Sequence, residues 1–349
     1  MRFAEAMSRH RAPWPGAVAV SGGGDSLALM HLLRNWAKNA RLAPPVVLTV
    51  DHGLQSRSTA HARKVLRSAR DLGLKAHLLT WNGVKPNADV EAEARRARYR
   101  LMGAWCRAHG IATLYVGHTR DDQAETFLLR LARGSGLDGL AAMRAVAPYP
   151  EEDFEELRVV RPLIDLERKA LREHLAALGH SWTEDPMNDD PRFGRVRIRG
   201  AMEGLTAAGL TAARIAEAAA HLGRAREALD AVTAAVLRRA CRADGDGILV
   251  EPAAILSAPR EVGLRALARL LMGVSGQSYR PRFERLERLF DVIGAGQLGA
   301  GRTLHGCRIG PAPSSRAFFG TDTLLIAREK GRKSEKRGQK PLHDATRSS

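Results

Sequence analysis

Residues 17–26 read AVAVSGGGDS, a short apolar run followed by three consecutive glycines and the sequence Asp-Ser. Leu29, Leu32, Leu33 and Trp36 then recur at helical spacing, so this stretch predicts a strand, a glycine-rich loop and a helix. Glycines let the backbone approach an anion closely, and the first amides of a helix point toward it. The predicted cofactor-binding residues of this loop are Ser21, Gly22, Gly23, Gly24, Asp25 and Ser26.

Asp25 is the acidic residue of the loop. Because a carboxylate repels phosphate, we expect Asp25 to hold Mg²⁺, which in turn binds the phosphates. No lysine follows the glycines, so the loop is not a Walker A motif, and its spacing is not that of a dinucleotide-binding GxGxxG loop. The alternative interpretation is a tight turn before a helix, with Asp25 and Ser26 near the helix cap.

Apolar runs and helical stripes continue to alternate along the first part of the chain. This pattern predicts an α/β fold with a doubly wound, mostly parallel sheet and helices on both faces. The expected strands are residues 17–20, 45–50, 75–79, 111–116 and 159–160. Ligands of such sheets bind beyond the carboxyl ends of the strands, where Asp51, His52 and His118 are placed. We therefore add Asp51 and His52 to the predicted cofactor-binding residues.

An acidic cluster, Asp121, Asp122 and Glu125, occupies the start of the helix expected after residue 116. Acids at a helix N-terminus stabilise the helix dipole, which is their structural interpretation. At the carboxyl end of a strand they also suit Mg²⁺ or an ammonium group. His118 fits either a contact to a phosphate or reacting base, or a structural role. The predicted catalytic residues are Asp25, Asp121, Asp122 and His118, and the predicted metal ligands are Asp25 and Asp122.

The composition points to a polyanionic partner. The 349 residues carry 55 Lys and Arg against 38 Asp and Glu, a net charge of +17. Nucleic acid is the leading candidate, and a generally arginine-rich proteome is the alternative explanation. The three cysteines, Cys106, Cys241 and Cys307, form no CxxC pair, which argues against a structural zinc or iron–sulfur site. Because residues 1–11 lack a signal sequence and no apolar run is long enough to span a membrane, we expect a cytoplasmic protein without a membrane partner.

Several motifs in order resemble a known family. SGGGDS at 21–26 is similar to the SGGxDS loop of the PP-loop ATP pyrophosphatase superfamily. Within that superfamily, about the first 200 residues resemble the bacterial tRNA(Ile)-lysidine synthase family. Met187 stands where that family usually has serine. The matching segments are VDHGL at 50–54, ARRARY at 94–99, GHTRDDQAET at 117–126, LARGSGL at 131–137, and DPMN at 185–188 followed by Phe193, Arg195, Arg197 and Arg199.

The resemblance implies an ATP-dependent carbon–nitrogen ligase that converts the wobble cytidine, position 34, of the CAU-anticodon isoleucine tRNA to lysidine. Adenylation makes the C2 oxygen a leaving group, and the ε-amine of free L-lysine then attacks C2. The implied cofactors are ATP and Mg²⁺, and the implied partners are this tRNA and L-lysine. The sequence leaves the oligomeric state open, with a homodimer as one alternative. The residues expected to contact substrate or RNA are Arg95, Arg98, Glu125, Arg133, Arg195 and Arg199.

Two alternatives stay open. One is another PP-loop tRNA-modifying enzyme of the thiolase type, which the lack of a CxxC pair disfavours. The other is a non-catalytic, basic RNA-binding protein, which the presence of Asp25, Asp121 and Asp122 disfavours.

The character of the sequence changes along the chain. Residues 1–199 are expected to form a PP-loop ATP-binding catalytic domain, and residues 200–293 a helical domain that contacts tRNA. Residues 294–329 are expected to form a small Gly-rich β segment, either in place of the final domain of longer family members or with that domain missing. Residues 330–349 are basic and polar, which predicts a disordered tail.

Overall fold

The computed structural model describes residues 2–54, 58–83, 85, 89–141, 143–183 and 194–329. The DPMN motif at 185–188, Phe193 and the basic tail at 330–349 lie outside the described residues. The chain forms two compact units, which meet in the sequence at Arg226 and Glu227. Among the described residues, none of the helices combines the length and apolar character that a membrane crossing requires.

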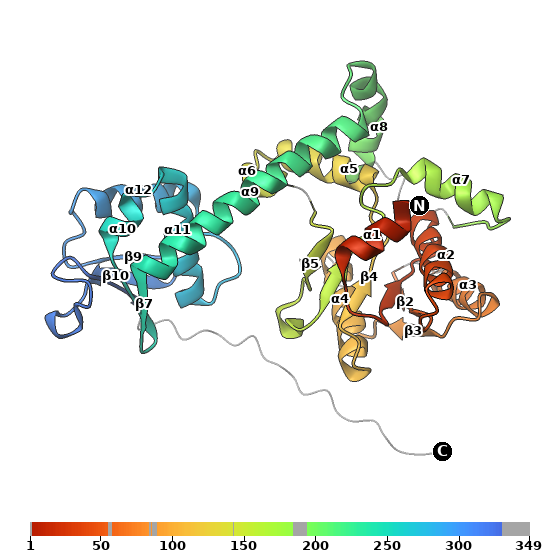
Figure 1. Cartoon of the computed structure of the whole chain (residues 1–349), viewed down its shortest axis with the longest axis horizontal. Helices are drawn as coiled ribbons and strands as arrows, with labels where there is room; N and C mark the ends of the chain where they lie inside the picture. Colours follow the sequence, from red (N-terminus) through yellow and green to blue (C-terminus); the bar gives the residue numbers. More distant parts are fainter. Residues whose placement is uncertain are drawn as a thin grey trace, which may run out of the picture. The chain divides into compact units, whose positions relative to one another are not determined.

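Unit 1 alternates strands and helices, as its sequence predicts (Figure 1). Its strands are β1 (Ala17–Ala19), β2 (Val46–Asp51), β3 (Ala76–Thr80), β4 (Thr113–Tyr115), β5 (Val146–Pro148) and β6 (Arg158–Val160). Its helices are α1 (Arg2–His10), α2 (Gly24–Asn39), α3 (Ser58–Asp71), α4 (Val90–Ala108), α5 (Arg120–Leu131), α6 (Leu137–Leu140), η1 (Glu152–Phe154), α7 (Arg168–Ala177) and α8 (Gly194–Ala207). Helix α9 (Ala212–Ala240) passes from this unit into the next.

The described strands of unit 1 form one sheet in the order β3-β2-β1-β4-β6-β5. All neighbouring pairs are parallel except β5 with β6, which are antiparallel. Strand β1 lies between β2 and β4, where the order of strands reverses direction along the chain. In an open parallel sheet, the loops that follow the strands at such a point form a crevice. The mostly parallel, doubly wound sheet predicted from the sequence is thus confirmed.

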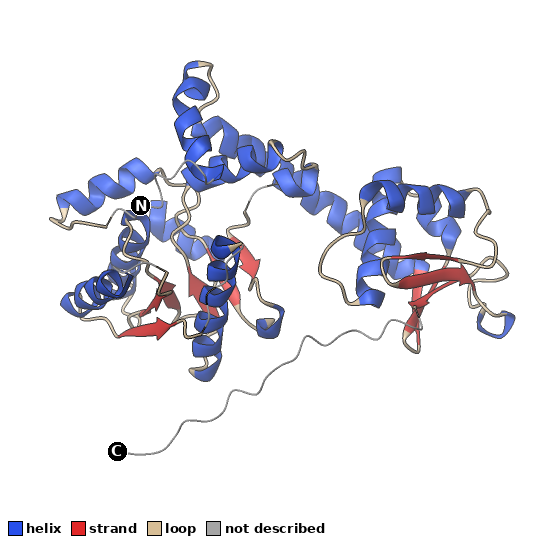
Figure 2. Ribbon diagram, turned by 180° about the vertical axis from the view of Figure 1, so that it is seen from behind, coloured by secondary structure: helices blue, strands red, loops and turns tan. Residues whose placement is uncertain are grey.

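Two hydrophobic cores cover the two faces of this sheet because successive strand residues point to opposite sides. Val18 and Val47 belong to a core shared with α2, α3 and α7, whereas Ala17 and Leu48 belong to a core shared with α4. Figure 2 shows the strands of unit 1 in red between blue helices. The N-termini of α2 and α5 are therefore held beside the ends of β1 and β4.

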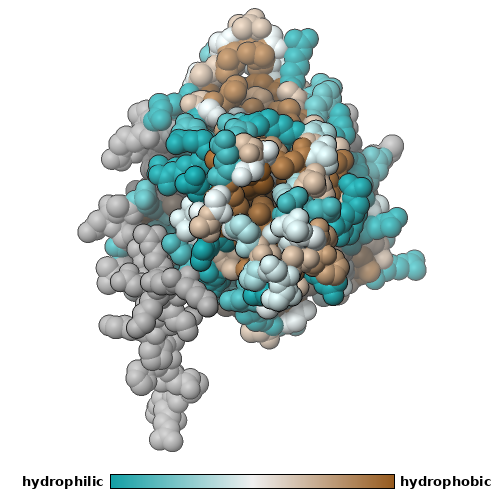
Figure 3. Space-filling model, turned by 90° about the vertical axis from the view of Figure 1, so that its left-hand side faces the viewer, coloured by the Kyte–Doolittle hydropathy of each residue, from teal (hydrophilic) through white to brown (hydrophobic). Residues whose placement is uncertain are grey.

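Unit 2 combines helices with an antiparallel sheet in the order β7-β8-β11-β10-β9. Its core brings apolar residues of α11 together with Ile309 and Ile326 of the sheet. The face of the molecule seen in Figure 3 is mostly hydrophilic around a small hydrophobic area. The described elements are β7 (Cys241–Asp244), β8 (Gly247–Val250), α10 (Pro252–Leu256), α11 (Arg260–Ser275), α12 (Phe283–Gly294), β9 (Arg302–Leu304), β10 (Cys307–Pro311), η3 (Ser314–Arg316) and β11 (Leu324–Arg328).

This arrangement differs from the domain boundaries expected from the sequence. The boundary expected at 199/200 falls inside α8, which contacts α5 and belongs to unit 1. The segment expected to be helical, 200–293, contains β7 and β8, and β8 pairs with β11. Residues 294–329 are thus part of the same unit as α10–α12, because their strands complete its sheet.

Candidate active site

The glycine-rich loop follows β1 and leads directly into α2. Gly22 has a φ of +94°, which an L side chain rarely adopts. The Ser26 hydroxyl closes the loop: it donates to the Gly23 carbonyl oxygen at 2.9 Å and accepts from the Ser21 amide at 3.2 Å. The amides of the first turn of a helix have no partner within the helix, so those of α2 are available to a ligand.

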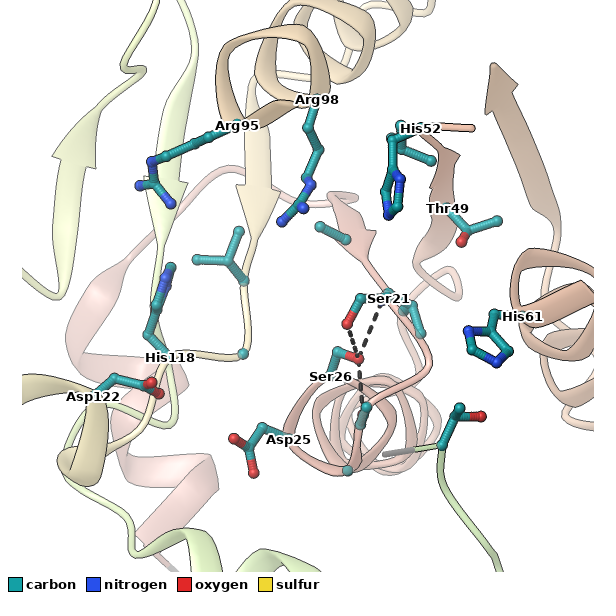
Figure 4. Close-up of a pocket in the computed structure, with 18 of the residues that line it drawn as sticks. Ser21, Asp25, Ser26, Thr49, His52, His61, Arg95, Arg98, His118 and Asp122 are labelled. Atoms are coloured by element: carbon teal, nitrogen blue, oxygen red, sulfur yellow. Dashed lines mark hydrogen bonds between the residues drawn. The ribbon is translucent and has the colours of Figure 1, made fainter. Parts of the chain in front are cut away.

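The loop borders a cavity of about 950 Å³ at the carboxyl end of the sheet (Figure 4). Arg95 and Arg98 reach from α4 toward this space, opposite Asp25 and the start of α2. Leu48, Val50 and Met102 supply an apolar part of the wall. The sequence-predicted residues that line the cavity are Ser21, Gly23, Gly24, Asp25, Ser26, His52, Arg95, Arg98, His118, Asp122, Arg195 and Arg199.

Gly117 allows the loop after β4 to approach α2. A Cβ atom at this position would lie 3.0 Å from the Asp25 carbonyl oxygen and 3.1 Å from the Ser26 Cα atom. Both are backbone atoms, so they cannot move aside as a flexible side chain would. The absence of a side chain at Gly117 thus sets how closely His118 and Asp122 approach the phosphate loop.

Asp122 has a structural contact on one carboxylate oxygen and an ionic contact on the other. Its Oδ2 atom accepts hydrogen bonds from the amide and the hydroxyl of Thr119, both at 2.8 Å, and so caps α5. Its Oδ1 atom accepts from Arg168 Nη2 at 3.0 Å. Burial alone would raise the pKa of Asp122, but the charge of Arg168 and the Thr119 hydrogen bonds hold it below its usual value.

Asp25 lies in the first turn of α2. Its Oδ2 atom accepts from Arg168 Nε at 3.1 Å, whereas its buried Oδ1 atom has no hydrogen-bond partner. Burial raises the pKa of this carboxyl, against the opposing charge of Arg168. An unpartnered carboxylate oxygen beside a phosphate-binding loop fits Mg²⁺, which typically uses one or two protein carboxylates together with substrate phosphates.

The same test applies to the other predicted metal ligand, Asp122. Both of its oxygens already accept hydrogen bonds, so it fits Mg²⁺ less well than Asp25. No group of three or more His, Cys, Asp or Glu residues suited to a metal occurs among the described residues. ATP fits the site through the loop amides and the serine hydroxyls.

Arg168, the first residue of α7, was not identified from the sequence. Its guanidinium group contacts Asp25, Asp122 and, through Nη1 at 2.9 Å, Glu125 Oε1. These carboxylates raise the pKa of Arg168 even though burial acts in the opposite direction. One signal in the sequence could have indicated Arg168. The helix dipole disfavours a cation at a helix N-terminus, so an arginine at the first position of α7 points to a role other than helix stability. Other cavity-lining residues that the sequence did not indicate are Thr49, Ser58, His61, Arg172 and Thr183.

Asp51 does not line the cavity, although it was predicted to bind the cofactor. Its carboxylate accepts hydrogen bonds from the Gly53 amide, the Ser58 hydroxyl and the Thr59 hydroxyl at 3.0, 2.5 and 2.6 Å. Burial would raise the pKa of Asp51, but these hydrogen bonds lower it. The structure therefore gives Asp51 a different role, which is to join the end of β2 to the start of α3.

Gly22, Asp121, Glu125 and Arg133 also lie off the cavity wall. Gly22 shapes the loop, and Asp121 Oδ2 accepts the amide of Arg168 at 2.8 Å. Glu125 lies behind Arg168 and accepts from Arg199 Nε at 2.7 Å. Arg133 is exposed after the end of α5. The direct contacts predicted for these four residues stay predictions, and Asp121 and Glu125 already bind groups of the protein.

His118 faces the cavity between the acids and the arginines (Figure 4). Burial, together with the charges of Arg161, Arg95 and Arg195, lowers the pKa of His118 to about 3. Its buried Nδ1 atom has no hydrogen-bond partner. At neutral pH the imidazole is therefore uncharged and available to contact a base or phosphate without repelling the neighbouring arginines.

The comparisons with known proteins agree with this site. A family profile described as a PP-loop domain matches residues 4–203. The chain is 43% identical over 300 residues to a tRNA(Ile)-lysidine synthase of Ruegeria pomeroyi, covering 83% of this chain and 70% of the relative. It is 34% identical over 332 residues to a tRNA(Ile)-lysidine synthase of Wolbachia pipientis, covering 95% of this chain and 74% of the relative.

One solved structure shares the fold. A U34-tRNA thiolase from Methanococcus maripaludis, determined with its [4Fe-4S] cluster, superposes with a TM-score of 0.52 at 16% identity, covering 64% of this chain and 76% of that chain. At this identity the likeness concerns the fold alone. In the present chain, Cys106, Cys241 and Cys307 do not line the cavity, and Cys106 lies in a different unit from the other two.

Proposed function

The chain belongs to the tRNA(Ile)-lysidine synthase family of PP-loop proteins, and we propose from this premise that it converts cytidine 34 of the CAU-anticodon isoleucine tRNA to lysidine. It is an ATP-dependent carbon–nitrogen ligase in this assignment. One observation carries the proposal: a single cavity joins an anion-binding loop to the carboxylates of Asp25 and Asp122. The reaction needs both, because it brings together a triphosphate and the ammonium group of lysine.

The loop and its surroundings suit ATP. The amides at the start of α2 and the hydroxyls of Ser21 and Ser26 face the phosphates, and the apolar wall of Leu48, Val50 and Met102 suits adenine. Asp25 Oδ1 would hold Mg²⁺, which when bound neutralises part of the phosphate charge. The loop amides also stabilise negative charge that develops on the departing pyrophosphate.

The proposed conversion of cytidine to lysidine proceeds in two steps. The C2 oxygen of the cytosine attacks the α-phosphorus of ATP, so that a P–O bond to pyrophosphate breaks and an adenylated base forms. The ε-amine of lysine then attacks C2, the bond from C2 to the adenylated oxygen breaks, and AMP departs. The amine attacks only after it has lost a proton, so a group near Asp122 must first bind the ammonium ion and then let the proton leave.

The acids and arginines divide these tasks by charge. Ionised Asp122, with Asp25 beside it, attracts the ammonium group of lysine. Neutral His118 faces the same space and suits a hydrogen bond to the base. Arg95, Arg98, Arg195 and Arg199 border the cavity and suit RNA or nucleotide phosphates.

Exposed arginines further along the chain are further candidates for contacts to RNA. Arg224, Arg238 and Arg239 are exposed on α9. Neutralising these three together should weaken tRNA binding and reduce its salt dependence. With fewer phosphate contacts, binding releases fewer counterions from the RNA. ATP affinity should stay unchanged.

Pyrophosphate release measured with ATP, tRNA and lysine tests the proposal. We expect release, and incorporation of labelled lysine into tRNA, only when all three substrates are present. A tRNA with uridine at position 34 should give no incorporation. Release that is indifferent to lysine would instead favour a PP-loop enzyme of another kind, and no release with any tRNA would favour a non-catalytic RNA-binding protein.

Two further parts of the proposal concern the setting of the enzyme. We place it in the cytoplasm, where free lysine, ATP and tRNA occur together, and we propose a homodimer. Light scattering coupled to size-exclusion chromatography measures the mass directly, and a mass near 38.0 kDa would contradict the dimer.

A further inference from the structure

Arg168 contacts four of the acids that the sequence placed near the site. Its backbone amide donates to Asp121, and its three guanidinium nitrogens donate to Asp25, Asp122 and Glu125. Asp25 comes from α2, whereas the other acids come from α5. One side chain on α7 thus joins the start of the phosphate-binding helix to the helix that carries the acidic cluster.

The shape of the guanidinium group explains why an arginine serves here. The group is planar and carries five N–H donors in a fixed arrangement, so it reaches three separate carboxylates at once. The three distances to Asp25, Glu125 and Asp122 are 3.1, 2.9 and 3.0 Å. A lysine ammonium is a single point donor and cannot span the same three positions.

The charges of the surrounding carboxylates also favour an arginine at position 168. Asp25, Asp122 and Glu125 bring three carboxylates to one place, and like charges this close repel each other unless cations separate them. Arg168 contacts all three, whereas Arg199 adds a second guanidinium that binds Glu125 through both of its oxygens. Arg168 and Arg199 thus compensate much of the negative charge that the three carboxylates bring together.

We propose that Arg168 is a positioning residue for the reaction, whose guanidinium group fixes Asp25 at the phosphate loop and Asp122 at the acidic cluster in one relative arrangement. It acts through these carboxylates. The inference rests on the proposed function, because the two carboxylates are assigned to the nucleotide side and the lysine side of the same cavity. A displacement of about 1 Å between reacting groups costs about 100-fold in rate.

The test compares three variants of the full chain. Arg168→Ala should lower kcat for lysidine formation by about 100-fold while KM for tRNA stays within about threefold, because Arg168 is not one of the arginines proposed to contact RNA. Arg168→Lys should recover part of the lost rate, because it restores a cation at one of the three positions. Lys169→Ala is the matched control, since Lys169 is the next residue of α7 and is 85% exposed; its kcat should equal that of the unmodified protein.

Chemical rescue separates positioning from a purely structural contact. Arg168 borders the cavity, so added guanidinium ion can reach the space left in Arg168→Ala. We expect guanidinium chloride at non-denaturing concentration to raise kcat of this variant by about tenfold over the same concentration of NaCl. A contact that merely holds α7 in place would lower the melting temperature, and guanidinium would then leave kcat per folded molecule unchanged.

The outcomes distinguish the inference from the function on which it rests. If the unmodified chain forms no lysidine, the proposed function fails. If the unmodified chain is active and Arg168→Ala matches it in kcat, or is slow without any rescue, the positioning role is overturned. If Arg168→Ala does not fold, Arg168→Lys decides: a kcat equal to that of the unmodified chain contradicts the proposal, and a lower kcat with unchanged KM for tRNA supports it.

Discussion

Arg168 in unit 1, which is partly buried, and Arg265 in unit 2, which is buried, both bind carboxylates from their surroundings. Arg265 is 2% exposed and lies in α11, where its Nε atom donates to Glu261 Oε1 at 2.8 Å, one turn back on the same helix. Its Nη1 atom lies 3.4 Å from Asp230 of α9, which also binds Arg269. Arg168 instead gathers carboxylates from helices that are distant in the sequence, and it borders a large cavity.

The difference shows that a buried ionic cluster is not by itself a sign of function. The partners of Arg265 come from its own helix and the helix packed against it, so the cluster can be explained by the satisfaction of buried charge. The carboxylates around Arg168 include Asp25, whose Oδ1 atom has no protein partner beside an open space. A cavity and an unpartnered polar atom together mark the cluster that is built for a ligand.

Among the variants that test this comparison, we expect the largest loss of activity for Asp25→Asn. Loss of the carboxylate should lower lysidine formation by about 1000-fold, because it removes the proposed magnesium ligand and one partner of Arg168. The melting temperature should change little, because loss of the ion pair with Arg168 is offset by removal of a buried charge that lies near Asp122. Single-turnover kinetics and thermal unfolding measure the two quantities.

Asp230→Asn is the control in unit 2, and its rate per folded molecule should equal that of the unmodified chain. Normal pyrophosphate release from the Asp25→Asn variant would show that the cavity-facing cluster is no more functional than the closed one.

Arg265→Ala tests the other side of the comparison. Removing one partner of a buried ion pair costs about 3 kcal/mol of unfolding free energy, because charge is left without compensation. Urea unfolding should show this loss, whereas kcat per folded molecule should not change. Arg265→Met should recover much of the stability, since an apolar side chain of similar length fills the space. A loss of kcat in a fully folded Arg265 variant would mean that unit 2 takes part in the chemistry.

His31 extends the comparison to a buried titratable group away from the cavity. Burial, with the charges of His180 and His174, lowers the pKa of His31 to about 4. Between pH 6.5 and about 4 the unfolded chain binds a proton that the folded chain does not, so stability falls as the pH is lowered through this window. His31→Gln should remove a loss on the order of 2 kcal/mol between pH 7 and 4.5.

Urea unfolding at several pH values measures this loss. His221→Gln, at an exposed histidine of α9, is the matched control and should leave the pH dependence unchanged. The prediction would be contradicted if the unfolding free energy of the His31 variant depended on pH as steeply as that of the unmodified chain.

Gly117→Ala should have the smallest effect of these variants. It tests the close contact between the loop after β4 and the start of α2. The new methyl group would press on the backbone of Asp25 and Ser26 at 3.0 to 3.1 Å, so the start of α2 must shift. We expect KM for ATP to rise by about tenfold, with a smaller change in KM for lysine. Gly204→Ala in α8, where a Cβ atom meets nothing within 4 Å, is the control. An unchanged KM for ATP in the Gly117 variant would show that the loop tolerates the shift.

The alternation of strands and helices and the phosphate loop could be predicted from the sequence because both depend on local patterns. Apolar runs, helical stripes and the glycines of residues 22–24 are read directly from neighbouring residues. Asp122 and Glu125 are three residues apart, a spacing that puts them on one face of the expected helix, and both bind Arg168 in the structure. Such features need no knowledge of distant contacts.

The remaining parts of the site depend on tertiary packing. Successive residues of a helix point about 100° apart, and which of Asp121 and Asp122 faces the cavity is settled by where α7 docks. Arg168 resembles many other arginines in the chain until its partners are known. The strands β7 and β8 are only four residues each, too short for alternation to distinguish them from the end of a helix.

Asp122 both caps α5 and contacts Arg168, and this double role has an evolutionary consequence. Its Oδ2 atom caps α5 through Thr119, independently of any ligand, whereas the Asp25 carboxylate contacts Arg168 and caps no helix. A duplicated copy of this gene that no longer needed the reaction would still be selected for a capping side chain at position 122. Position 25 would drift first, and loss of Asp25 with retention of Asp122 would therefore be the early mark of a decaying copy.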